Sequence, residues 1–156
     1  MLTDAQQQTL PAALRAEQAT AVVAALAIRN DVALTEWCNA ASTVDAWNEA
    51  MSGKDLFEAT NVTLFDNLTA GKRDAWRLLL SFAPIDMGRN KNRKAVLDIW
   101  GATNATTVLQ SCTRKATHAE SYLGGTDAIT NGVTAKKLNF TGQLSINEVS
   151  IALNRF

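Results

Sequence analysis

The sequence predicts a mainly α fold, a single compact helical domain with a small C-terminal β-hairpin or extended arm. Three observations predict it. The 156 residues are the length of one ordinary domain. Alanine, the strongest helix former, occupies 26 positions, and helix-capping motifs and apolar runs at helical spacing recur along the chain. We expect one domain over residues 1–156, with a helical body over 3–123 and a strand or arm and last helix over 126–156.

The N-terminal third predicts short elements. Thr3 and Gln6 have the spacing of a capping box that opens a first helix, and Pro11 either restarts or kinks that helix. Polar caps and one β-branched run then mark a helix over 32–39, a strand over 43–47 and a helix over 53–59.

The central part predicts longer helices. Thr69 stands before a helical run over 70–82, and a second run over 89–100 ends at Gly101. We expect these two helices to pack as an antiparallel pair. Over 104–123 apolar residues recur at alternating steps of three and four, which predicts a third helix with one buried face.

The C-terminal part changes in character. Asn131-Gly132 predicts a turn, the segment 133–141 an exposed strand or arm, and the capping box of Ser145 and Glu148 a last helix over 146–154. This strand either adds to the sheet of a neighbouring subunit or folds back on its own domain. The residues that would form such a strand-addition arm are Thr134, Lys136, Leu138 and Phe140.

Residues that carry chemistry are sparse. His118 is the only histidine, and we expect it on a polar helix surface. The two cysteines, Cys38 and Cys112, belong to no metal-binding pattern, and we expect buried free thiols. The sequence contains no phosphate-binding loop and no nucleophile motif. We therefore expect no catalytic residue, metal or cofactor, and not an enzyme. We also expect no signal peptide and no membrane span, and synthesis in a cytoplasm.

Charge is distributed unevenly along the chain. Residues 1–70 carry nine acidic and three basic side chains, and residues 71–156 carry six acidic and twelve basic ones. This asymmetry either pairs internally or suits head-to-tail assembly of subunits. The basic residues that would contact a partner or phosphate are Arg89, Lys91, Arg93, Lys94, Arg114 and Lys115. DNA is a secondary expectation, because the net charge is zero and no aromatic residues lie among the basic ones.

Several segments together resemble a family of small tailed-bacteriophage proteins. They are Arg29–Ser42, Thr43–Trp47, Leu68–Arg77, Asp86 with Asn90–Val96, and Thr113–Leu123. The resemblance extends from about residue 29 to the C-terminus, and none of these segments carries a catalytic residue. Residues 39–42 replace a proline-containing turn of the family.

The resemblance implies a virion or assembly component that is made in the bacterial host cytoplasm. Size and helical content then favour an oligomeric ring at the head-tail connector or in the tail, in contact with itself and with portal or tail proteins. Two alternatives stay open: a capsid-surface or minor head protein, and a DNA-contacting packaging or assembly protein.

Overall fold

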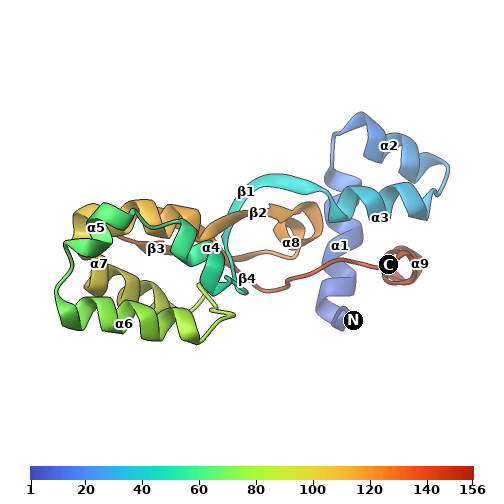
Figure 1. Ribbon diagram of the computed structural model, residues 1–156. Coiled ribbons are helices and arrows are strands. Elements are labelled where there is room, and N and C mark those ends of the chain that lie inside the picture. The colour runs from blue at the N-terminus through green and yellow to red at the C-terminus, as the bar shows by residue number, and fades with distance from the viewer. The chain divides into compact units, whose positions relative to one another are not determined.

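The computed structural model describes all 156 residues (Figure 1). Helices make up 58% of the chain and a four-stranded mixed sheet 17%. The helices are α1 (Asp4–Ala16), α2 (Thr20–Ala27), α3 (Asp31–Asn39), α4 (Gly53–Glu58), α5 (Val62–Asp66), α6 (Ala70–Ser81), α7 (Asn90–Ser111), α8 (His118–Tyr122) and α9 (Ile146–Arg155). The strands are β1 (Ala41–Trp47), β2 (Thr113–Thr117), β3 (Gly125–Thr130) and β4 (Val133–Leu138). The prediction of a mainly α domain with a small hairpin is therefore wrong, and the fold is mixed α/β.

The four strands form one sheet in the order β2-β1-β4-β3. β1 and β4 run parallel, with Ala46 opposite Lys136. β3 and β4 are joined by Asn131 and Gly132, whose φ angles of 51° and 79° are those of a tight hairpin turn. The Asn-Gly pair predicts this turn from the sequence. The pairing of β4 with β1 joins residues far apart in the chain, so no local sequence pattern predicts it.

The position of β4 corrects the prediction of a strand-addition arm. Thr134, Lys136 and Leu138 belong to β4, an inner strand whose two neighbours are β1 and β3. A strand with a neighbour on both sides presents no free edge to which a further strand could add. Phe140 follows β4 and is half-buried against apolar residues of its own unit.

The single helix predicted over 104–123 is also wrong. α7 ends at Ser111, β2 follows, and α8 begins after Thr117. Thr117 and Glu120 form a complete capping box, in which the backbone N–H of each is bound by the other's side chain. A helix that begins at such a box cannot continue an earlier one. The spacing of apolar residues over 104–123 does not indicate this helix start.

The chain forms two compact units, whose bounds differ from those of the predicted helical body over 3–123 and C-terminal piece over 126–156. Unit 1 comprises residues 1–44, 115–125 and 138–156. Unit 2 comprises residues 45–114 and 126–137. The C-terminal helix α9 therefore belongs with the N-terminal helices, and its apolar face explains why. Val149, Ala152 and Leu153 of α9 are buried together with residues of α1 and α3.

Each unit has its own apolar core. In unit 1 it contains Leu10, Leu14, Leu34 and Cys38, all fully buried. In unit 2 it is built around three tryptophans, Trp47, Trp76 and Trp100. The rings of Trp76 and Trp100 meet edge to face at 5.3 Å, an arrangement that aromatic quadrupoles favour. The indole nitrogens of these two residues have no hydrogen-bond partner.

Candidate functional site

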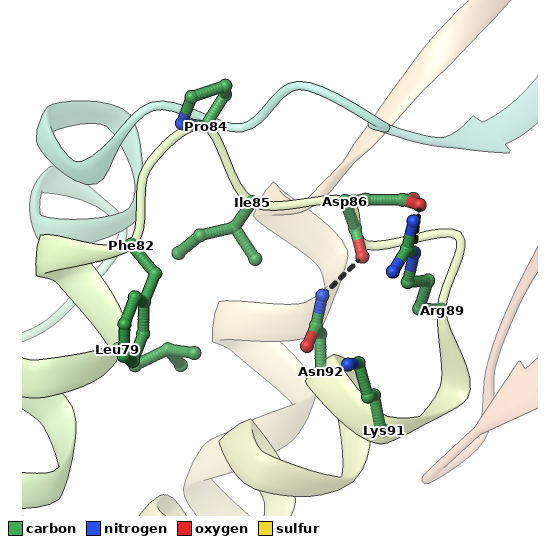
Figure 2. A pocket seen from close by; sticks show the side chains of 8 residues that line it. All are labelled: Leu79, Phe82, Pro84, Ile85, Asp86, Arg89, Lys91 and Asn92. Carbon is green, nitrogen blue, oxygen red and sulfur yellow. Dashed lines mark hydrogen bonds and ion pairs between the residues drawn. The ribbon is translucent and has the colours of Figure 1, made fainter.

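Unit 2 carries an open pocket where the loop between α6 and α7 meets the two helices (Figure 2). Its volume is about 570 Å³. α6 begins after Thr69, whose hydroxyl accepts a hydrogen bond from the backbone of Lys72, and it ends before Phe82. α7 starts at Asn90. The residues between these helices therefore form the rim of the pocket.

One wall of the pocket is apolar and is formed by Leu79, Phe82, Pro84 and Ile85 (Figure 2). Ile85 is held in place by two backbone hydrogen bonds to Met51, of 2.8 and 2.9 Å. Its side chain is buried in the core, whereas Phe82 is 65% exposed. The loop is therefore anchored on the core and leaves a large aromatic ring open to solvent.

The opposite wall is polar and is organised by Asp86. The Oδ1 atom of Asp86 accepts a 2.8 Å hydrogen bond from the backbone of Gly88, and its Oδ2 atom binds the Nε atom of Arg89 at 2.9 Å. The amide of Asn92 donates to the Asp86 carbonyl at 2.7 Å (Figure 2). Lys91 lines the same wall, is exposed and forms no ion pair. This wall thus offers an ammonium group to an acidic partner.

A second pocket of about 340 Å³ continues the first between α6 and α7. The two pockets share Leu79 and Phe82. Its other lining residues are Ala75, Leu78, Ala95, Asp98 and Ile99. We call the two pockets together the α6–α7 groove. Apart from the exposed Asp98, it is apolar along the helices, and it is basic at the loop end. This combination suits an apolar segment followed by a carboxylate.

The basic residues predicted to contact a partner are divided by the fold. Arg89 and Lys91 line the groove, and Lys94 is exposed on α7. Arg114 and Lys115 lie on β2 and have contacts of their own. For Lys115 these include a 3.2 Å hydrogen bond from its Nζ atom to the Thr43 carbonyl. The structure therefore brings only Arg89 and Lys91 together at one pocket.

Arg93 must be removed from this set, because its side chain is only 4% exposed. Its Nε atom donates to the Thr130 hydroxyl at 2.9 Å, and its Nη1 atom donates to the carbonyls of Met87 and Gly88 at 2.7 and 2.8 Å. The guanidinium lies 4.8 Å from the ring centre of Trp47. Burial lowers the pKa of Arg93, and the nearby Asp86 opposes that shift. The Arg93 side chain therefore binds groups inside unit 2 and is not available to a partner.

Unit 1 contains a polar and aromatic cluster that the sequence did not predict. His118 stacks on Trp37 with ring centres 4.1 Å apart, in place of the predicted polar surface position. The Nε1 atom of Trp37 donates to the Tyr122 hydroxyl at 2.9 Å, and that hydroxyl donates to Glu17 at 2.7 Å. Burial lowers the pKa of His118 and raises that of Tyr122 to about 12, and the Tyr122 hydrogen bond lowers the pKa of Glu17.

The two cysteines lie in different units and both are buried. Burial raises the pKa of each thiol to about 12, which keeps both protonated at neutral pH. No group of three or more histidine, cysteine, aspartate or glutamate side chains is placed to hold a metal ion. None of the helices has the length and apolar character needed to cross a membrane.

The two folded units differ less in net charge than the two halves of the sequence do. Unit 1 carries six acidic and four basic side chains, and unit 2 carries nine acidic and eleven basic ones. The difference in net charge is smaller between the units than between the halves of the sequence, because the acidic residues over 45–66 fold in the same unit as the basic residues over 72–94. Charge complementarity between subunits therefore has to come from local surfaces.

A comparison with protein-family models, curated proteins and solved structures found no match.

Proposed function

We propose that this chain is a non-enzymatic structural subunit that assembles with copies of itself. The observation that carries the proposal is the α6–α7 groove, an open apolar surface with a basic end. Phe82 and Leu78, which line it, are 65% and 58% exposed. Contiguous exposed apolar surface next to a hollow is typical of surfaces that bind another protein.

The setting that we propose is a tailed-bacteriophage particle, and it rests on the resemblance of the sequence. Two segments that carry that resemblance are Leu68–Arg77 and Asp86 with Asn90–Val96. They supply most of α6, the polar end of the groove and the first turns of α7. In that setting the subunit would form a ring at the head-tail connector or in the tail, in contact with portal or tail proteins.

A DNA-contacting role is the second candidate. Lys91 and Lys94 are exposed without ion pairs and favour it. The burial of Arg93 and the pairing of Arg89 with Asp86 reduce the free basic groups. The apolar groove has no part in a contact with phosphates, so we rank this role below assembly.

Sedimentation velocity and native mass spectrometry of the purified protein over a range of concentrations test the assembly role. We expect a defined oligomer that high salt weakens, because Lys91 lies at the groove. A chain that stays monomeric at every concentration, alone and with purified phage tail or portal proteins, would overturn the proposal.

Quantitative mass spectrometry of purified particles separates the two virion locations. About one ring of copies per particle supports the connector or tail. Many copies per particle support the capsid surface. Salt-dependent binding to duplex DNA that the double variant Lys91→Ala, Lys94→Ala abolishes would favour the DNA-contacting role instead.

A further inference from the structure

Unit 1 carries an apolar face that is left open to solvent. α2 contains no charged residue, and of its eight residues only Val22 and Ala25 are buried. Val23 is exposed on α2, Ile28 is 75% exposed at its C-terminal end, and Val32 is exposed at the start of α3.

The open face extends onto α3, which packs against α2 (Figure 1). Val32 and Glu36 are one helical turn apart and both are exposed, so they share a face of α3. Glu36 forms no ion pair. We call Val23, Ala24, Ala27, Ile28, Val32 and Glu36 together the α2–α3 face. It is apolar along α2 and ends in an unpaired carboxylate.

We propose that the α2–α3 face of one copy docks into the α6–α7 groove of a second copy. The inference rests on the proposed self-assembly and names the two surfaces that meet. An apolar helix face held in a groove between helices is a recurrent mode of protein recognition. Small residues on both sides, Ala24 and Ala27 on the face and Ala75 and Ala95 in the groove, permit close approach of the backbones.

Charge favours a second copy as the occupant. Residues 70–98 span the groove and carry seven basic and three acidic side chains; without the buried Arg93 their net charge is +3. Residues 17–36, which include the face, carry three acidic and one basic side chain, a net of −2. Unpaired Lys91 at the groove matches unpaired Glu36 on the face.

The contact joins two different surfaces, so it is heterologous. Each copy keeps one free surface of each kind after the first contact, and further copies can add head to tail until a ring closes. This is the kind of contact that the proposed ring subunit needs.

Charge reversal provides a test in which the two single variants rescue each other. Glu36→Lys places a lysine opposite Lys91, and Lys91→Glu places a glutamate opposite Glu36. We expect each variant alone to lower the association constant by about tenfold or more. Mixed in equal amounts, the two variants present opposite charges at each contact between unlike copies, and we expect assembly to recover with the two variants in alternation. The double variant should recover it too.

An apolar pair of variants tests the same contact independently. We expect Ile28→Asp to abolish assembly, because the carboxylate would be buried in an apolar groove. Val62→Asp is the matched control, since Val62 is 62% exposed in unit 2 but lies outside the groove. We expect it to leave assembly unchanged. All substituted side chains are exposed, and unchanged circular dichroism and melting temperature would confirm folding.

The outcomes separate this inference from the proposed function. Loss of assembly in the single variants with recovery in the mixture supports the docking. A wild-type oligomer that Glu36→Lys, Lys91→Glu and Ile28→Asp all leave intact would overturn the docking and leave self-assembly standing. A strictly monomeric wild-type chain would overturn the self-assembly itself.

Discussion

Replacing Arg93 with alanine should destabilise unit 2 strongly. The change removes the three hydrogen bonds that the charged guanidinium donates. The Thr130 hydroxyl and the carbonyls of Met87 and Gly88 then lose this donor. Each buried acceptor left unpaired costs about 1 kcal/mol or more, and the lost stacking on Trp47 adds about 1 kcal/mol. We therefore expect the free energy of unfolding to fall by about 3 to 4 kcal/mol.

Urea unfolding followed by tryptophan fluorescence measures this change, since three of the four tryptophans lie in unit 2. Arg93→Lys should lose about half as much, because an ammonium keeps the charge but lacks the planar fork of donors. Lys94→Ala, an exposed neighbour without an ion pair, is the control and should stay within about 0.5 kcal/mol of wild type. An Arg93→Ala chain whose unfolding free energy lies within about 1 kcal/mol of wild type would contradict this role of Arg93.

Three further predictions concern single positions. Gly101 has φ 73° and ψ 160°, and no atom lies near an added Cβ. Gly101→Ala should therefore lower the free energy of chemical unfolding by about 2 kcal/mol through backbone strain alone. Gly71→Ala is the control and should not destabilise the protein. Burial raises the pKa of Cys38 to about 12, so its thiol stays protonated in the folded chain and the free energy of unfolding falls as pH rises from about 9 towards 12. Cys38→Ala should make this fall shallower. An unchanged slope would contradict a contribution from Cys38. The pKa of His118 is lowered by burial and held up by Glu17, so stability should fall as pH drops below about 6.5. NMR titration should give a midpoint for His118 that Glu17→Gln lowers further, and a higher midpoint in that variant would exclude the charge contact.

The α6–α7 groove illustrates how much of a site the sequence can show. The basic residues at its polar end, Arg89 and Lys91, stand out in the sequence as a charged run. The apolar wall does not, because Ile85 takes its place only through backbone hydrogen bonds to Met51, in a different segment of the chain. Arg93 belongs to the same charged run and yet faces the core. Nothing in its immediate neighbours distinguishes it from Lys94.

Features that depend only on neighbouring residues can be predicted from the sequence. The capping boxes at Thr3 and Ser145 and the turn at Asn131-Gly132 are formed by hydrogen bonds or backbone angles within a few residues. For the same reason the helix starts after Thr69 and Ser52 agree with the structure. Local free energy decides these points, so they can be read from the chain.

The fold class, the two compact units and the direction of the Arg93 side chain depend on long-range packing. The parallel pairing of β1 with β4 and the packing of α9 with α1 bring together segments from opposite ends of the chain. Burial of apolar surface is not directional, so which apolar faces meet depends on every other face that competes for them. Capping motifs and helical periods do not record that competition.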